Sequence, residues 1–145
     1  MVEGLKLLAE DAADLDVIAA AAQDALVRMG DVSFDKRAHR FTAVINRFRW
    51  ETAGEHGPFE RVRSALSFES VLAVKSRKVR HDSPDALAAV LQIGFAPSED
   101  APGGVVQVVL AGGGEIMLNV ECLDALLMDI GAPWRTPRRP DHEDA

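Results

Sequence analysis

Apolar residues alternate with other residues on both sides of a glycine run, and this pattern constrains the fold more than any other feature. The alternating residues are Val106, Val108, Leu110, Ile116, Leu118 and Val120, and Gly112–Gly114 lies between the two groups. A period of two places such residues on one face of a strand pair. Glycine supplies the positive φ that a tight hairpin loop requires. We predict a hairpin with Gly112–Gly114 as its loop, in which Gln107 lies opposite Asn119.

The same glycines do not match a phosphate-binding loop. Such a loop opens a helix and follows the pattern Gly-x-x-x-x-Gly-Lys-Ser/Thr. That pattern is absent, and Glu115 stands where a basic residue would help. We therefore predict an exposed hairpin tip with no nucleotide role.

The two longest predicted strands, Arg40 to Trp50 and Glu60 to Lys75, flank the breaker-rich loop 52–58. Pairing centred on this loop gives an apolar face and places Asn46 opposite Ser64. The apolar face consists of Val44, Phe48, Trp50, Val62, Leu66 and Phe68.

The opposite face of this hairpin is predicted to carry four arginines in one cluster, with Arg47 opposite Arg63 and Arg49 opposite Arg61. Like charges directly opposed in a sheet are unfavourable, so the cluster needs carboxylates from elsewhere or an external anion. Guanidinium groups bind phosphate and carboxylate in a bidentate manner. The cluster is our candidate anion-binding site, and neutralisation by Glu51, Glu60 or terminal acids is the alternative.

Charge is divided unevenly along the chain. Residues 36–80 hold eleven Lys and Arg against four acids, although the formal net charge of the whole chain is −7. Either the acidic ends fold over the basic middle and neutralise it, or the middle presents a basic face to an anionic partner.

The remaining patterns predict an N-terminal strand at Leu5 to Leu8, a helix ending near Gln23, and short strands at 25–29 and 32–34. Residues 84–95 fit a strand, with a helix as the alternative. A second helix is expected from Asn119 or Glu121 to Ile130, because its apolar residues follow helical spacing. These residues are Leu123, Leu126, Leu127 and Ile130.

The predicted fold class is α+β. An antiparallel sheet of about seven strands, strongly curved into a barrel or sandwich, carries an N-terminal helix and a C-terminal helix packed on it. This arrangement is analogous to pleckstrin-homology-like barrels at the level of fold only. Residues 1–134 are expected to form a single globular domain, and residues 135–145 a mobile tail.

No residue pattern identifies a catalytic site, a metal site or a cofactor. Cys122 is expected to be a buried, inert thiol rather than a reactive one. The four histidines are scattered without the spacing of metal ligands. No catalytic residue, metal or cofactor is therefore predicted.

The segments "RFTAVINRFRWE", "VLAVKSR" and "AGGGEIMLNVECLDALLMDIG" occur in this order and spacing. In these segments the chain resembles a family of small bacterial proteins classed only as a domain of unknown function. The resemblance extends to about Trp134. It implies membership of a group and brings no activity or catalytic residue with it.

The start of the sequence lacks the features of a signal peptide, the single cysteine precludes an internal disulfide, and no apolar run approaches the ~20 residues of a membrane span. We therefore expect a cytoplasmic protein. The function favoured is a non-enzymatic binding or adaptor module that meets an acidic protein segment or a small anion, and an enzyme with an unrecognised site is the alternative. The acidic net charge argues against nucleic acid, and a homo-oligomer is left open.

Overall fold

The computed structural model of this chain describes residues 4–79 and 83–140. This part of the chain has ten strands, which form one antiparallel sheet, and a single helix. The elements are β1 (Lys6–Ala9), α1 (Ala12–Ala21), β2 (Leu26–Asp35), β3 (Arg40–Phe48), β4 (Glu60–Phe68), β5 (Val71–Arg77), β6 (Leu87–Pro97), β7 (Gly104–Leu110), β8 (Glu115–Val120), β9 (Ala125–Asp129) and β10 (Trp134–Arg135).

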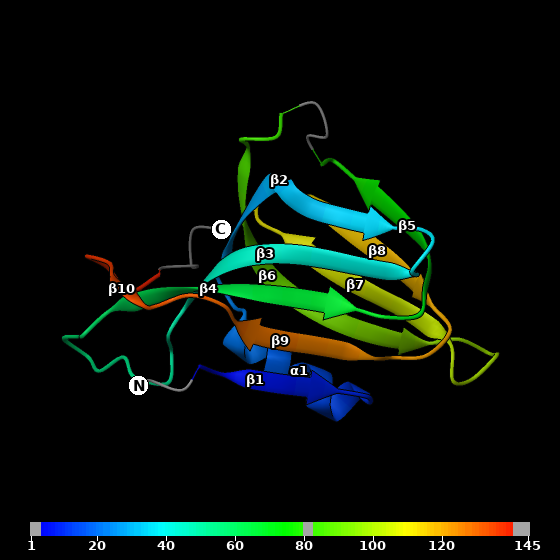
Figure 1. The fold of residues 1–145 in the computed structure, drawn as a ribbon, viewed down its shortest axis with the longest axis horizontal. Coiled ribbons are helices and arrows are strands. Elements are labelled where there is room, and N and C mark those ends of the chain that lie inside the picture. The colour runs from blue at the N-terminus through cyan, green and yellow to red at the C-terminus, as the bar shows by residue number, and fades with distance from the viewer. Residues whose placement is uncertain (1–3, 80–82, 141–145) are drawn as a thin grey trace.

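The sheet has the strand order β1-β9-β4-β3-β2-β6-β7-β8-β5, and β10 pairs separately with β4. It is folded into two layers, with β1, β9, β4, β3 and β2 in front and β6, β7, β8 and β5 behind (Figure 1). The layers join through β2, because its first residues, Leu26–Arg28, pair with β6 and Leu26 and Val27 also pair with β3, whereas Val32–Asp35 pair with β3 alone. A register shift between Val27 and Val32 separates these two halves of β2.

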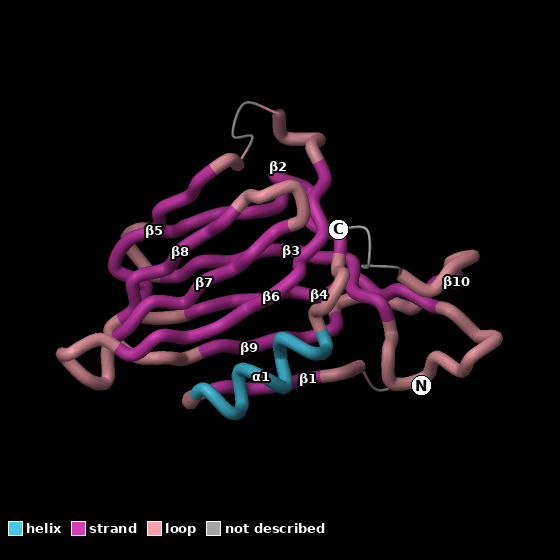
Figure 2. The backbone as a smooth tube through the Cα atoms, turned by 180° about the vertical axis from the view of Figure 1, so that it is seen from behind, coloured by secondary structure: helices cyan, strands magenta, loops and turns pink. Residues whose placement is uncertain are grey.

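The hydrophobic core lies between the two layers. Side chains such as Ile45, Phe68, Leu118 and Leu127 point inward and are at most 1% exposed. At the lower edge, α1 lies beside β1 and next to β6 of the back layer (Figure 2) and buries Leu15 and Ile18. The helix thus covers the seam between β1 and β6, where the two layers would otherwise leave the core open to solvent.

The predicted antiparallel sheet is confirmed, but the count of seven strands and the C-terminal helix are wrong. Residues 125–129 form β9, which is hydrogen-bonded between β1 and β4. Ala125 and Leu127 face the core with 1% and 0% exposure, whereas Ile130 is 48% exposed. The leucine spacing fits either period, and the strand prevails because both of its edges find partners. Without that helix, the analogy with pleckstrin-homology-like barrels has no support.

The predicted turn is confirmed at Gly112 and Gly113, which are exposed and have φ values of +88° and +93°, whereas Gly114 is buried and its carbonyl accepts from the amide of Leu110 at 2.8 Å. The predicted register is wrong by two residues, because Val108 pairs with Ile116 and Gln107 pairs with Met117. A shift of two residues preserves the alternation of faces, so the apolar face is the one predicted.

Other expected boundaries also change. The long strand from Glu60 to Lys75 breaks into β4 and β5 at Glu69 and Ser70, where Ser70 has a φ of +58°. The two short strands at 25–34 are one bulged strand, β2, while the strand expected at 84–95 is confirmed as β6.

The predicted C-terminal tail makes ordered contacts in its first part. Arg135 belongs to β10, and the amide of Thr136 donates to the carbonyl of Phe59 at 2.9 Å. The guanidinium of Arg139 lies 5.5 Å from the centre of the Trp50 ring. Residues 141–145, the last part of this predicted tail, lie outside the described residues.

We expect the substitution Leu127→Ala to lower the free energy of unfolding by about 2–5 kcal/mol, because it leaves a cavity in a fully buried site. Leu8→Ala, on the neighbouring strand β1 and 63% exposed, is the matched control and should change that free energy by about 0.5 kcal/mol or less. Urea denaturation measures both. Equal effects would contradict the position of β9 between β1 and β4.

Candidate functional site

The hairpin of β3 and β4 has a register one residue away from the predicted one. Arg47 lies opposite Val62, and Asn46 lies opposite Arg63. A shift of one residue moves one strand to the other face of the sheet. The predicted cluster of Arg47, Arg49, Arg61 and Arg63 on one face is therefore wrong, and so is the pairing of Asn46 with Ser64.

The inner face of β3 is formed by Phe41, Ala43, Ile45 and Arg47 rather than by Val44 and Phe48. On β4, the predicted inward positions Val62, Leu66 and Phe68 are confirmed as buried. Phe48 is also buried, but against the aromatic rings of Trp50 and Phe59 at the end of the strand. Phe48 lies on the outer face at the end of β3, and these two rings shield its apolar side chain from water.

Arg47 is held by two carboxylates of the protein, the buried Asp129 and the partly exposed Glu51. Its side chain is 0% exposed, and its Nε and Nη2 atoms each donate to an oxygen of Asp129 at 2.8 Å. Its Nη1 and Nη2 atoms donate to Glu51 at 3.0 and 2.8 Å. Asp129 also accepts from the hydroxyl of Ser64 at 2.7 Å and from the amide of Leu5 at 2.9 Å. The network therefore joins β3, β4, β9, the residue that precedes β1 and the loop after β3.

The ionisation of these groups follows from their contacts. Burial alone would lower the pKa of Arg47 and raise that of Asp129, but the hydrogen bonds of the network outweigh burial. The pKa of Arg47 is therefore raised, and the pKa of Asp129 is lowered. The hydrogen bond from Arg47 is also the main cause that lowers the pKa of Glu51. All three groups are charged at neutral pH.

The other three arginines are also engaged within the protein. Arg49 donates to Glu60 at 2.7 Å. Arg61 donates to the carbonyl of Asn46 at 2.9 Å, and its guanidinium lies 5.9 Å from the centre of the Phe48 ring. Arg63, which is half exposed, has a carboxylate oxygen of Asp31 at 3.9 Å.

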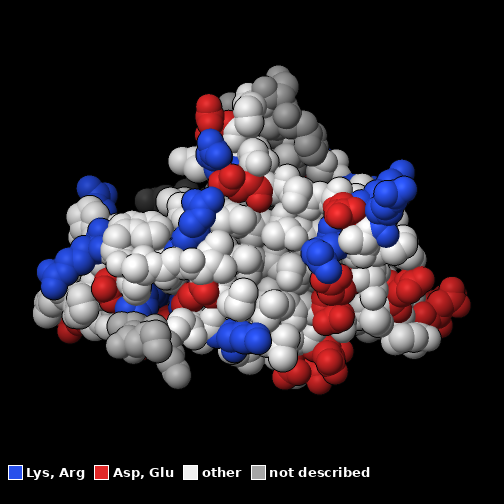
Figure 3. Space-filling model, in the orientation of Figure 1, with Lys and Arg blue, Asp and Glu red and all other residues white. Residues whose placement is uncertain are grey.

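The alternative that Glu51 and Glu60 neutralise part of the basic segment is therefore supported for Arg47 and Arg49. The outer face of the front layer carries basic and acidic side chains near one another, without a continuous basic patch (Figure 3).

A second seam, between β2 and β5, remains open. Its lining residues delimit a cleft of about 320 Å³: Met29, Val32, Ser33, Phe34, Phe41, Val74, Ser76, Val79 and Ile116. Met29, Val32, Phe34, Val74 and Val79 are only partly buried against the core. No helix or strand of residues 4–79 and 83–140 covers this seam as α1 covers the other one.

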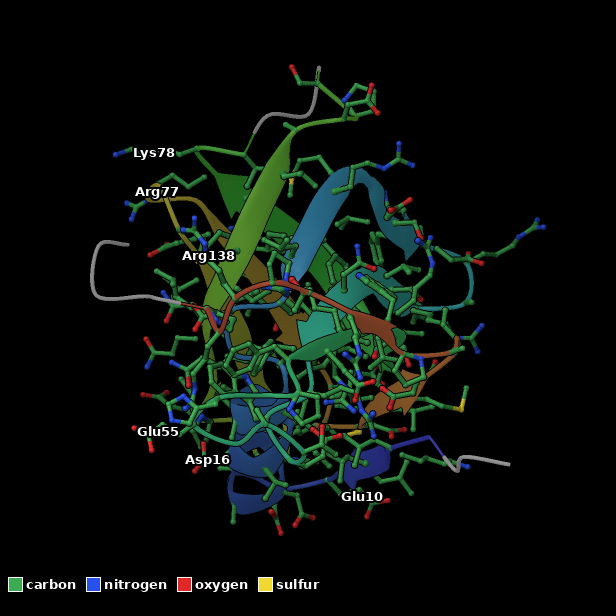
Figure 4. All side chains as sticks on the ribbon, turned by 90° about the vertical axis from the view of Figure 1, so that its left-hand side faces the viewer. Glu10, Asp16, Glu55, Arg77, Lys78 and Arg138 are labelled. Atoms are coloured by element: carbon green, nitrogen blue, oxygen red, sulfur yellow. The ribbon has the colours of Figure 1, made fainter. Side chains whose placement is uncertain are left out.

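Basic side chains gather beside this cleft, which we call the β2–β5 cleft. Lys75 and Lys78 are exposed, and within the described ranges no carboxylate lies within 4.0 Å of either ammonium group. Arg77 has Glu115 at 3.4 Å and keeps 66% of its side chain exposed. Figure 4 shows Arg77 and Lys78 pointing outward, away from the body of the protein.

The part of the chain that the structure describes also bears on the expectations for metal ligands, a reactive thiol and membrane-spanning helices. No group of three or more His, Cys, Asp or Glu side chains there could hold a metal ion. Cys122 is partly exposed between β8 and β9 rather than in a helix. None of the described helices is long and apolar enough to cross a membrane.

Asp129 and the cations of β5 were not identified as site residues from the sequence. The helix expected up to Ile130 includes Asp129 and gives no reason to place this residue beside Arg47. Lys75 and Arg77 alternate with Val74 and Ser76, which is typical of a strand with one charged face, and this signal was present in the sequence.

Comparison with known proteins gives one family. The family model described as "Protein of unknown function (DUF2948)" matches residues 5–142. No curated protein and no solved structure matches the chain.

We expect Arg47→Ala to lower the free energy of unfolding by about 3–5 kcal/mol, because it leaves the buried carboxylate of Asp129 without its partner. Arg63→Ala removes a half-exposed cation from the same hairpin and should cost about 1 kcal/mol or less. Chemical denaturation separates the two. A small cost for Arg47→Ala would mean that its charge is solvated and not part of this network.

The network also predicts a pH dependence. Because the pKa values of Asp129 and Glu51 are lowered by folding, the unfolded chain binds more protons in acid. The stabilisation is present above the unfolded pKa values of about 4 and is lost as the pH falls through the lower folded values. In Glu51→Gln the free energy of unfolding should fall less steeply over this range than in the original protein. An unchanged slope would exclude Glu51 from the network.

Proposed function

Because this chain belongs to the DUF2948 family, whose function is unknown, we propose its function from the structure. The protein is a non-enzymatic binding module, and its β2–β5 cleft receives an acidic segment of another protein. The observation that supports this proposal most is the coincidence of an uncovered apolar cleft with exposed cations along one of its edges.

The charges favour an acidic partner. Lys75, Arg77 and Lys78 lie together on a chain whose net charge is −7, so they form a local basic site in an acidic protein. Such a site attracts carboxylates and raises their rate of association, while the rest of the surface repels them.

The apolar lining favours a protein segment over a free anion. Val32, Phe34 and Val74 are partly exposed in the cleft, and their burial needs an apolar partner. A phosphate or carboxylate ion alone would leave them in contact with water. Protein interfaces combine an apolar centre with a polar rim, and this cleft has both.

The proposed site differs from the one expected from the sequence, although the class of partner is the same. Arg47 and Arg49 are neutralised internally, so the partner is assigned to Lys75 and Lys78, which have no such carboxylate among the described residues, and to Arg77, which stays 66% exposed beside Glu115. A nucleic acid would bring many negative charges to an acidic protein, and no observation on the described residues favours the alternative of an enzyme.

To test this, a peptide of alternating valine and glutamate, seven residues long and blocked at both ends, is titrated into the protein by calorimetry. We expect saturable binding that weakens with salt, because the contact is partly electrostatic. Lys75→Glu should weaken binding at least tenfold, since it reverses a charge at the site. The control Lys6→Glu makes the same change on the exposed edge strand β1 and should have a much smaller effect.

Three results would contradict the proposal. The peptide fails to bind, the two charge reversals weaken binding equally, or the corresponding valine–lysine peptide binds as well as the acidic one. Saturable binding of inorganic phosphate at Lys75, with the peptide as a mere competitor, would make this a small-anion site instead.

A further inference from the structure

The β2–β5 cleft lies between two strand edges that have no strand partner on that side among the described residues. β5 is the last strand of the sheet order and pairs with β8 alone. β2 pairs with β6 only at Leu26–Arg28, so its later part, Val32–Asp35, is paired with β3 on one side only. Edges of this kind can accept an added strand through backbone hydrogen bonds.

We propose that the acidic segment binds as an added β-strand on the free edge of β5, with alternate apolar and acidic side chains. This inference rests on the function proposed above and specifies how the segment is recognised. Its apolar side chains enter the β2–β5 cleft, and its carboxylates lie next to Lys75 and Arg77.

The alternation of β5 supports this pattern. Val74 lines the cleft, whereas its neighbour Lys75 and the residue two positions further, Arg77, are exposed on the opposite face. An added strand places its side chains beside those of the neighbouring strand on the same face. Side chains next to Val74 are therefore buried, and those next to Lys75 and Arg77 meet positive charge.

Contacts at both ends of the seam limit the length of the segment. At one end, the amide of Val71 donates to the carbonyl of His39 at 2.9 Å. At the other end, the amide of Gly30 donates to the carbonyl of Pro84 at 2.8 Å. The free edge between these closures matches a short strand, about as long as β5 itself.

A second copy of this chain is a poor occupant of the same edge. Pairing of β5 with β5 would bring Lys75 and Arg77 of one copy close to the same cations of the other, and like charges across a strand pair are destabilising. Cations on an edge strand can also serve only to prevent such pairing, which is the main alternative explanation.

The test uses two N-methylated forms of the valine–glutamate peptide, one methylated on the valine amides and one on the glutamate amides. In an extended strand, alternate amides point to opposite edges, so each form loses the amide donors of one edge. We expect at least one form to bind ten times more weakly than the parent peptide. A peptide with the same residues in one valine block and one glutamate block should also bind at least tenfold more weakly.

Hydrogen exchange of the full chain gives an independent measurement. Binding of the parent peptide should slow the exchange of amides in β5, and the amides of the other edge strand, β1, serve as the control. Tight binding of both methylated forms, or unchanged exchange in β5, would overturn strand addition while leaving acidic-segment binding intact.

Failure of the proposed function itself would give a different result. The parent peptide would not bind, and the double substitution Lys75→Ser with Arg77→Ser would make the protein self-associate, which would show that the cations only prevent pairing of β5 with other copies. That outcome overturns both proposals, and analytical ultracentrifugation detects it.

Discussion

The ion pair between Arg47 and Asp129 determines how the front layer of the sheet is assembled. A guanidinium that is 0% exposed is tolerated only with a carboxylate partner, and Asp129 supplies it from β9. This places β9 beside β4, where Ser64 donates to the same carboxylate. It also holds the N-terminal segment, because the amide of Leu5 donates to Asp129. One buried charge pair thus connects segments from both ends of the chain and selects the register of the β3–β4 hairpin.

The two seams between the layers differ in how they protect the core. α1 covers the lower seam and buries Leu15 and Ile18 there. The upper seam leaves Val32, Phe34 and Val74 only partly buried. Removal of apolar surface from water stabilises a fold by about 25 cal/mol per Å², so the uncovered seam makes the protein less stable than a covered one would. A partner that fills the seam would bury these side chains, and the free energy of that burial would favour binding.

The sequence predicted those parts of the fold in which alternation with a period of two is clear, such as the apolar faces of β7 and β8. Clear alternation also favoured the strand at β6 over the helix that was its alternative. It failed where the outcome depends on distant residues. Leu123 and Leu127 fit both a helix and a strand, and the choice depends on the edges offered by β1 and β4. The register of β3 depends on Asp129, which lies 82 residues away from Arg47. For the candidate site, composition predicted a basic region but could not tell which cations find carboxylates.

The distribution of these cations follows from their place in the sheet. Arg47 and Arg49 lie on or next to an inner strand, where neighbouring segments bring Asp129, Glu51 and Glu60 within reach. β5 has a neighbour on one side only, so Lys75 finds no such carboxylate in the described ranges. A charge of this kind on an edge disfavours a second β5 strand, because it would bring the same charge to the pair. The same charge favours a strand that carries carboxylates. Rejection of the chain's own copies and selection of an acidic partner can therefore result from the same side chains.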